Sequence, residues 1–526
     1  MKIKAQIITG IAICLILGIG LSQAQQTPPP NPYINPEAKR EIRKSEPGFY
    51  PLGFRPNLTQ PATLAPGAFK FKPKVKALPA AFDWRPGGTT PVKNQAIWPT
   101  CWIFGTMGEV EAKIKLQEIP PGDPDYAEMD VLEGVAEGTR PPGDLLAGGH
   151  PKEVANHLSR YATLNEASNP YSTAGAFPTP PIANYWNPPK GTGQRVAREW
   201  HDLGNVDQLG QVTLLKNIIL SVGPVTASVR VDTINIWSAP PATPASPGVL
   251  FNSFGWNSNW VVPYLATSSP PDHAILIVGW DDTKAWYGTP SPGSGAWLVK
   301  NSWGTAWGLP SADAGYFWIA YGSARIGSQA GYFPRTGFTT YDSNQSLLHY
   351  DEFGSWGASG WTSQYDVWAL NVFTPPDNGE ITAIEFWATY QNLSYDVRVF
   401  DTWTDTSSSP TVQLGGSASG ILTDAGYYTA TLSSPAPVAV GNDIYVLVRI
   451  TDLSNSFVYL IPYEVDASSP GYTSLWFPNS KQTETNKCYA RYSTGMSWAS
   501  MNTMGDVGVR ARMTHATSGI REWSLY

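Results

Sequence analysis

The spacing of hydrophobic residues changes near Phe338 and divides the chain into two parts. Residues 101–117 place their apolar side chains near one face of a predicted helix, and 214–220 predict another. Short apolar runs predict strands at 225–231, 274–280, 296–300 and 315–321. This mixture predicts an α+β first part over residues 78–335. Pro- and Asn-rich surface insertions are expected at 176–192 and 238–271.

After Phe338 the apolar residues follow a period of two. Ile384, Phe386, Ala388 and Tyr390 alternate with polar or oppositely facing residues, and the pattern returns at 395–399 and 507–513. Clusters of Gly, Ser, Asn and Pro separate these runs. Many short strands with turn signals predict an all-β jelly-roll or sandwich domain over residues 336–516. Residues 517–526 are expected to form a tail.

The N-terminus predicts an export signal over residues 1–24. Lys2 and Lys4 precede an apolar stretch at 7–21, and the small-residue motif Ser22-Gln23-Ala24 follows. An uncleaved membrane anchor is the alternative, but the apolar run is short for a span. No later stretch is apolar enough to cross a bilayer. We therefore expect a protein that is secreted or held at the cell surface, with a periplasmic location also open.

Residues 25–77 form a Pro-rich arm with nine basic and three acidic side chains, whereas the whole chain has a net charge of −7. The arm either binds the acidic remainder electrostatically or forms a solvated linker, and both interpretations remain open. The negative overall charge argues against nucleic acid as a partner.

The chain has 3 cysteines, and Cys14 lies within the predicted signal. Cleavage would leave Cys101 and Cys488, so an exported disulfide scaffold is excluded. Cys101 opens the helix predicted over 101–117, where backbone N–H groups and the helix dipole favour a thiolate. Cys488 is expected to be a buried structural thiol.

A base and its partners follow Cys101 along the chain. Of the six histidines, only His273 directly precedes a continuous apolar run, at residues 274–278. Asn301 can accept a hydrogen bond from the far ring nitrogen of His273 and fix its tautomer. Trp303 is expected to cover this bond and exclude water. The Gln95 side chain, together with the Cys101 backbone N–H, is expected to form an oxyanion hole.

Other hydrolase classes lack comparable motifs. The chain contains no nucleophile-elbow serine motif, no His-Glu-x-x-His and no metal-loop spacing of acidic residues. We therefore expect neither a metal ion nor a cofactor.

These residues resemble the papain family of cysteine peptidases. The carrying segments are Leu78-Pro79-Ala80-Ala81-Phe82-Asp83-Trp84-Arg85, Pro91-Val92-Lys93-Asn94-Gln95, Cys101-Trp102 with Phe104, Gly148-Gly149, Asp272-His273-Ala274, Asn301-Ser302-Trp303-Gly304 and Trp307-Gly308. The resemblance covers residues 78–335. It implies a two-lobed fold, with a helical lobe and a β-barrel lobe, and a zymogen in which a pro-segment precedes Leu78.

The resemblance also implies a secreted endopeptidase that acts on proteins or peptides through an acyl-thioester intermediate. The implied catalytic residues are Cys101, His273, Asn301 and Gln95. The implied substrate-binding residues are Gly148, Gly149, His150, Pro271 and Trp303, with Pro151 and Ser228 beside them. Pro151 and Pro271 favour an apolar side chain in the main specificity pocket, while His150 would also admit an acidic one.

Three departures from the family pattern stand out. Pro99-Thr100 replaces the usual Gly-Ser before the nucleophile, the usual disulfide cysteine near Trp98 is missing, and residues 25–77 lack a long helical pattern. The helical lobe must therefore rely on packing alone.

Residues 336–516 are similar to the lectin-like domain that follows some microbial papain-type peptidases. This similarity implies a glycan or a cell-surface ligand. An alternative function is therefore an exported carbohydrate- or protein-binding adhesion protein with a degenerate peptidase domain. Seven tryptophans could stack on sugar rings or instead fill the core of the sandwich: Trp356, Trp361, Trp368, Trp387, Trp403, Trp476 and Trp498.

Overall fold

The structure is a computed structural model that describes residues 52, 54, 77–96, 98–117, 123–135, 148–171, 195–231, 261–262, 264–286, 293–309, 313–352, 354–361, 363–456, 459–464, 485–502 and 504–516. The predicted signal, nearly all of the arm over 25–77, the insertion at 176–192, most of the one at 238–271, Trp476 and the tail over 517–526 lie outside the described residues. Among the described residues, no helix combines the length and apolar character needed to cross a membrane.

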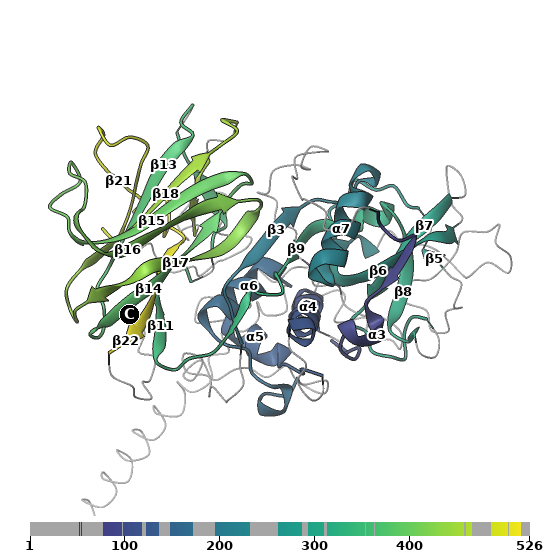
Figure 1. Cartoon of the computed structure of the whole chain (residues 1–526). Helices are drawn as coiled ribbons and strands as arrows, with labels where there is room; N and C mark the ends of the chain where they lie inside the picture. The colour runs from purple at the N-terminus through teal and green to yellow at the C-terminus, as the bar shows by residue number, and fades with distance from the viewer. Residues whose placement is uncertain are drawn as a thin grey trace, which may run out of the picture. The chain divides into compact units, whose positions relative to one another are not determined.

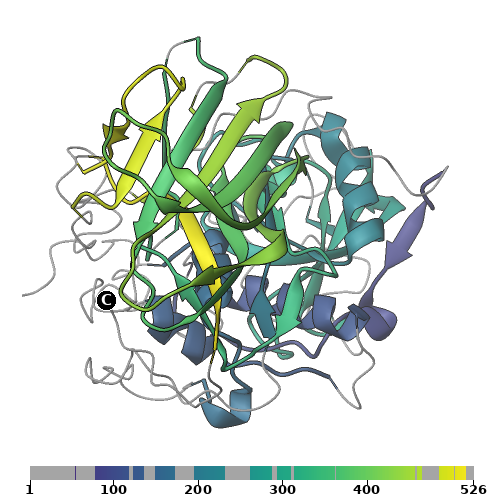
Figure 2. The same cartoon turned by 60° about the vertical axis from the view of Figure 1, so that its left-hand side comes forward.

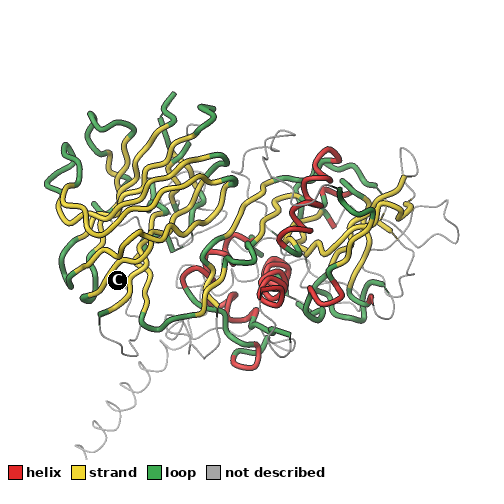
Figure 3. The backbone as a smooth tube through the Cα atoms, in the orientation of Figure 1, coloured by secondary structure: helices red, strands yellow, loops and turns green. Residues whose placement is uncertain are grey.

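The described α-helices lie in the first part of the chain, residues 77–335 (Figures 1 and 3). They are α3 (Arg85–Gly88), α4 (Cys101–Gln117), α5 (Glu128–Val135), α6 (Pro151–Arg160) and α7 (Val212–Val222). The helix predicted over 101–117 coincides with α4, and the one predicted over 214–220 lies within α7. Both predictions are confirmed.

Helix α4 is buried on nearly every side, which its polar residues did not predict. All residues from Cys101 to Ile114 are buried, including Glu109, Glu111 and Lys113. Each charged group finds a partner: Glu111 binds Lys93 at 2.8 Å, Glu109 accepts from Thr226, and Lys113 donates to the Val222 carbonyl at 2.9 Å. Paired charges make such burial tolerable, so α4 is a central helix rather than an amphipathic surface helix.

The strands of the first part are joined in one sheet. They are β1 (Ala81–Asp83), β3 (Trp200–Gly204), β4 (Val225–Val229), β5 (Val261–Val262), β6 (His273–Trp286), β7 (Gly293–Lys300), β8 (Tyr316–Ala320) and β9 (Ser328–Tyr332). The order is β3-β9-β4-β6-β7-β8-β5, with β1 also paired to β6. A short separate pair joins β2 (Arg195–Ala197) to β10 (Phe338–Thr340). The four predicted strands are confirmed as β4, β6, β7 and β8.

The second part of the chain, residues 336–516, is all β (Figure 2). One layer comprises β11 (Gln345–Leu348), β22 (Val509–His515), β14 (Gly379–Ala388) and β17 (Ala425–Val438). The other comprises β16 (Thr411–Leu422), β15 (Leu393–Thr402), β18 (Ile444–Asp452), β13 (Asp366–Phe373), β20 (Cys488–Arg491) and β21 (Ala499–Ser500). A small pair joins β12 (Gly357–Ser359) to β19 (Ile461–Tyr463). Apolar residues from both layers share one core, which confirms the predicted sandwich.

A single sheet continues from the first part of the chain into the second. Strand β17 pairs antiparallel with β3, so that Gly426 faces His201 and Tyr427 faces Trp200. At Gly426 the backbone has φ +146°, and a Cβ there would lie 2.0 Å from the Trp200 carbonyl oxygen. Only glycine permits this approach. The period-two pattern predicted β17 but gave no sign of its partner.

His201 lies beside this junction between two carboxylates. Its Nδ1 and Nε2 each lie 2.7 Å from a carboxylate oxygen, of Asp424 and Glu199 respectively, and its ring stacks on Tyr332 at 4.6 Å. Burial disfavours the charged ring, but the two carboxylates prevail and raise the pKa of His201 to about 9. His201 is therefore an imidazolium at neutral pH.

We expect the stabilisation contributed by His201 to depend on pH. A raised pKa in the folded state contributes stability that is fully present below the ordinary value of 6.5 and is lost as the pH rises through about 9. The free energy of unfolding should therefore fall by up to about 3 kcal/mol between these pH values. Urea unfolding of residues 25–526 would measure it. His201→Gln should remove this slope; an unchanged slope in that variant would contradict the assignment.

Candidate active site

Cys101 lies beside Ala274, the residue after His273, because helix α4 packs its first turn against the start of strand β6. Cys101 is the first residue of α4, and its Sγ accepts a hydrogen bond from the Ala274 backbone N–H at 3.4 Å. A Cβ at Gly105 would lie 3.4 Å from the Ile275 nitrogen, in ordinary van der Waals contact with β6. The side chains of Cys101 and His273 are fully buried. The helix N-terminus favours a negative sulfur at this place.

Asn301 orients the ring of His273. The Nε2 atom of His273 lies 2.8 Å from Asn301 Oδ1, which also accepts from the Ser302 backbone N–H at 2.8 Å. Because Oδ1 only accepts, Nε2 must carry the hydrogen, and Nδ1 presents its lone pair. This Nδ1 is buried and has no hydrogen-bond partner among the described residues. Burial lowers the pKa of His273 to about 4, against which the Asn301 bond acts to raise it.

Trp303 covers the imidazole. Its ring centroid lies 4.8 Å from that of His273, and the side chain is fully buried. Trp307 meets Trp303 edge to face at 5.0 Å. These rings exclude water from the His273–Asn301 bond, which strengthens it.

Gln95 is held by contacts with the segment that follows Asn301. Its Oε1 accepts from the Ser302 hydroxyl at 2.6 Å, and its backbone N–H donates to the Ser302 carbonyl at 2.8 Å. The side-chain Nε2 donates to the Trp98 carbonyl at 2.8 Å. The role of Gln95 as an oxyanion donor stays a prediction.

The segment Gly148–His150 packs beside the start of α4, against Trp102. A Cβ at Gly149 would lie 2.5 Å from the indole of Trp102, so the segment presses its backbone against the residue after the nucleophile. Gly148 has φ +79°. Phe54 forms a parallel bridge with Gly149. The Phe54 backbone N–H donates to the carbonyl of Asp272, the residue before His273, at 3.1 Å.

His150 is a neutral side chain. Its Nδ1 accepts from the Lys152 backbone N–H at 3.0 Å, so Nε2 carries the hydrogen and faces Gln329 Oε1 at 3.1 Å. Burial and the nearby Lys152 ammonium lower the pKa of His150 to about 3. A neutral ring has no charge to attract an acidic side chain. This argues against the prediction that His150 admits an acidic substrate side chain into the main specificity pocket. The Phe54 ring lies 5.4 Å from His150.

The remaining predicted pocket residues are buried near these groups. Ser228 pairs with Ala274 across β4 and β6, and its hydroxyl donates to the Ser328 carbonyl at 2.7 Å. Pro151 begins α6 directly after His150, and Pro271 is buried two residues before His273. Their contacts with a substrate stay predictions.

A buried ionic cluster behind Asn301 was not expected from the sequence. The Lys93 ammonium lies within 3.0 Å of carboxylate oxygens of Glu111 and Glu128. Lys300, the residue before Asn301, donates to the Thr90 carbonyl at 2.9 Å, and burial lowers its pKa to about 8. A cavity of about 20 Å³ separates these groups from Asn301 and is large enough for one water molecule. These contacts hold the end of β7, and Asn301 directly after it, against α4.

The described part of the chain contains no group of three or more His, Cys, Asp or Glu side chains arranged to hold a metal ion. Two residues at the site were missed by sequence reasoning: Phe54, hidden in a Pro-rich arm, and Trp102, which was noted only as part of a motif. A lone apolar residue in such an arm carries no positional signal.

Comparison with protein families finds two matches. Residues 78–239 and 256–333 match the papain family of cysteine proteases, and residues 347–511 match the lectin-like domain. Curated relatives of the first part include cysteine proteinase 1 of Dictyostelium discoideum, 26% identical over 264 residues that cover 48% of this chain and 64% of the relative. The oryzain gamma chain of Oryza sativa subsp. japonica is 30% identical over 255 residues, covering 48% and 58% respectively. The chain thus spans less than two thirds of these relatives.

A solved structure matches both parts together. It contains the cysteine protease and lectin-like domains of Cwp84, a surface layer associated protein of Clostridium difficile. The identity is 21%, the TM-score is 0.62, and the match covers 85% of this chain and 91% of that one. A structure of clostridial Cwp84 after propeptide cleavage has the same TM-score and covers 83% and 99%. At this identity the likeness establishes the fold, an α+β papain-like unit followed by an all-β domain.

The family matches and the shared two-part fold agree with the arrangement of Cys101, His273 and Asn301. Residues 78–239 and 256–333 therefore match the papain family of cysteine proteases and share its fold, and residues 347–511 match the lectin-like domain.

Proposed function

We propose that the protein is a cysteine endopeptidase. The carrying observation is the set of contacts that places Cys101 at a helix N-terminus beside Ala274, with His273 bonded to Asn301 at 2.8 Å. A nucleophile, a base and an orienter of that base are the parts that acyl transfer to a thiol requires. The completeness of the set argues against a degenerate peptidase domain.

The first half of the reaction forms the acyl-enzyme. The Cys101 thiolate attacks the peptide carbonyl carbon, and the oxyanion receives hydrogen bonds from the Gln95 side chain and the Cys101 backbone N–H. The His273 imidazolium then donates its Nδ1 proton to the departing amine, and the C–N bond breaks. An acyl-thioester on Cys101 remains.

The second half releases the acid. Neutral His273 removes a proton from water, whose oxygen attacks the thioester carbonyl. Collapse of the second tetrahedral intermediate breaks the C–S bond, releases the carboxylic acid and restores the thiolate–imidazolium pair. Throughout, Asn301 keeps the Nε2 hydrogen in place, so Nδ1 is the nitrogen that gains and loses the proton.

The two cysteines should respond differently to an epoxide that alkylates catalytic thiolates. Peptide hydrolysis and labelling of processed protein should be lost in Cys101→Ala. Cys488→Ala should retain both, because burial and nearby Asp506 raise the pKa of the Cys488 thiol well above its usual range. Mass spectrometry of the labelled peptide identifies the site. Full hydrolysis by Cys101→Ala would refute the proposed nucleophile.

We propose further that residues 25–77 are an inhibitory pro-segment. Phe54 lies where a substrate would lie, with its backbone beside Gly149 and Asp272 and its ring beside His150. Leu52 is buried in the hydrophobic cluster of the strand-rich lobe. With the site covered, the lowered pKa of His273 keeps the ring neutral and disfavours the ion pair. Removal of the segment would admit water and move this pKa back toward its ordinary value.

Loosening this segment should activate the unprocessed protein. Phe54 is only 6% exposed, and Phe54→Ala removes most of its apolar contact. We expect epoxide labelling of residues 25–526 to accelerate about tenfold or more, since losing a buried Phe side chain costs about 3 kcal/mol or more. Phe54→Leu should remain close to the unmodified rate. Equal labelling rates for all three proteins would show that Phe54 does not cover the site.

The proposed location is outside the cell or at its surface. The basic and apolar pattern over residues 1–24 favours export. The described residues contain no spanning helix, and the structurally similar Cwp84 is a surface layer associated protein. Protein or peptide substrates would be met there.

A second proposed activity is glycan binding by the lectin-like domain. Trp368 and Trp403 lie partly exposed on the outer face of the six-stranded layer, beside buried Trp498. Arg491 is 3% exposed, and its guanidinium lies 4.2 Å from the Trp498 ring. Its Nη2 donates to Ser409, but Nε and Nη1 have no hydrogen-bond partner among the described residues. Aromatic faces with an unsatisfied guanidinium suit an acidic sugar.

The tryptophans of this domain therefore fall into a buried group and a partly exposed group. Trp356 and Trp387 are buried where the domain contacts the helical lobe, as core residues would be, whereas Trp361, Trp368 and Trp403 are partly exposed. Trp368→Ala should weaken binding to a uronic-acid oligosaccharide by about tenfold. Calorimetry against the neutral counterpart of this sugar separates stacking from charge. Unchanged binding by Trp368→Ala, or none by any form, would exclude this face.

A further inference from the structure

Helix α6 links the substrate-binding segment to the lectin-like domain. The helix follows Gly148 and Gly149 directly, and His150 is its N-cap. The His150 backbone N–H donates to Glu153 Oε1 at 3.0 Å, which completes a capping box. A shift of α6 would thus be transmitted to Gly148 and to Gly149, which packs against Trp102, the residue after Cys101.

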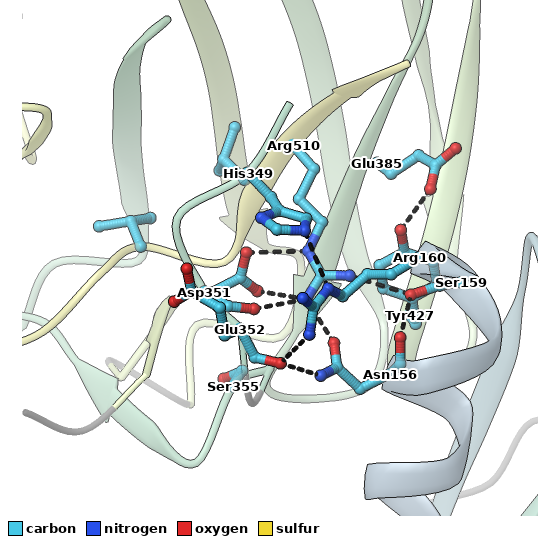
Figure 4. A network of polar contacts seen from close by, with 12 residues as sticks. Asn156, Ser159, Arg160, His349, Asp351, Glu352, Ser355, Glu385, Tyr427 and Arg510 are labelled. Carbon is cyan, nitrogen blue, oxygen red and sulfur yellow. Dashed lines mark hydrogen bonds and ion pairs between the residues drawn. The ribbon is translucent and has the colours of Figure 1, made fainter. Parts of the chain in front are cut away.

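Two arginines of strand β22, Arg510 and Arg512, contact the C-terminal half of α6. Figure 4 shows the contacts of Arg510. Arg510 donates to Ser159 Oγ at 2.9 Å and also to Asn156 Oδ1. Arg512 Nη2 donates to the Ser159 backbone carbonyl at 2.9 Å. This carbonyl belongs to the last turn of the helix, where carbonyls lack helical partners and cations are favourable.

The arginines are fixed by carboxylates of their own domain. Arg510 makes a two-pronged ion pair with Asp351, at 2.8 and 2.7 Å, and both side chains are fully buried. Glu385 holds Arg512 at 2.9 and 3.0 Å and also accepts from Tyr427. A buried guanidinium is costly unless its geometry is well satisfied. Arg510 therefore reaches α6 in one orientation only.

The segment before β12 contacts α6 from the same domain. The Glu352 carbonyl accepts from Asn156 Nδ2 at 2.6 Å and from Arg160 Nη1 at 2.6 Å. The Arg160 Nε also donates to His349 at 2.8 Å. These contacts engage the same turns of the helix as Arg510 does (Figure 4).

The first turn of α6 is held by aromatic rings of the lectin-like domain. The Lys152 ammonium lies 5.5 Å from the Trp356 ring and 5.1 Å from the Trp387 ring. Trp356 also meets the His150 ring edge to face at 5.7 Å. Contacts between an ammonium and an aromatic ring strengthen when the ammonium is removed from water. The lectin-like domain therefore contacts both ends of α6 and its N-cap.

Neither Cys101 nor Cys488 forms a disulfide, so no covalent bond between described residues ties α6 to α4. We propose that the lectin-like domain is a positioning element of the peptidase: through Arg510 and Trp356 it fixes α6, and thereby the Gly148–His150 segment that binds substrate backbone. This inference rests on the proposed peptidase function. Arg510 and Trp356 are positioning residues that act through α6 and do not touch reacting atoms.

Two thiol reagents separate positioning from chemistry. Iodoacetamide needs only the Cys101 thiolate, whereas a peptidyl epoxide also needs the Gly149 backbone in place. In processed protein, Arg510→Met should reduce the peptidyl epoxide rate about tenfold or more, with the iodoacetamide rate unchanged. On a peptide substrate, KM should rise more than kcat falls. Arg398→Met is the control for loss of an arginine–carboxylate pair away from α6, because Arg398 forms a solvent-exposed pair with Asp396, at 2.7 Å, on the outer layer of the same domain. It should leave both rates unchanged.

A second variant and a second measurement keep the inference testable if Arg510→Met folds poorly. Trp356→Ala should give the same selective loss, and Trp356→Phe should restore most of it. Hydrogen exchange of the peptide covering 148–160 should accelerate in Arg510→Met and Trp356→Ala but not in Arg398→Met. Unchanged exchange and an unchanged ratio of the two labelling rates would overturn the inference. If the unmodified protein neither labels nor hydrolyses, the proposed function fails, and exchange alone still decides the positioning role.

Discussion

The packing of α4 against the start of β6 is the contact on which the site depends. It brings the thiol of Cys101 to the backbone of Ala274, although 173 residues separate them in sequence. The surrounding structure favours this contact: α4 is buried throughout its first fourteen residues, and β6 lies between β4 and β7. A helix that central is positioned by the whole lobe, so the proposed nucleophile is held in place by packing, with no disulfide between described residues.

The order of motifs along the chain was enough to predict which residues lie at the candidate site. Cys101 at a helix start, His273 at a strand start and Asn301 after a strand each occupy an element end, where local pattern is informative. The structure brings His273 and Asn301 within 2.8 Å, as the spacing anticipated. The periodicity change near Phe338 likewise predicted the sandwich, because a half-buried strand imposes alternation regardless of its partner.

The sequence could not predict which strands and which charged side chains pair when they lie far apart along the chain. Nothing local distinguishes a strand that pairs within its own domain from β17, which pairs with β3 of the other. Buried charges were missed for the same reason. Glu111, Arg510 and Arg512 read as surface residues until their partners are known, and those partners lie 18, 159 and 127 residues away. The neutral state of His150 follows from its burial and from Lys152, whose own burial depends on the lectin-like domain.

His150 is where the three parts of the chain converge. Phe54 of the arm lies on one side of its ring, Trp356 of the lectin-like domain meets another edge, and Gly149 of the substrate segment precedes it. Lys152 lowers the pKa of His150, and the same ammonium is held by two lectin-domain rings. The His150 ring is therefore neutral at neutral pH, while the Lys152 ammonium beside it carries the charge. Burial is the larger cause of this neutral state and the Lys152 ammonium the smaller, so the lectin-like domain contributes to it through the two rings that hold Lys152.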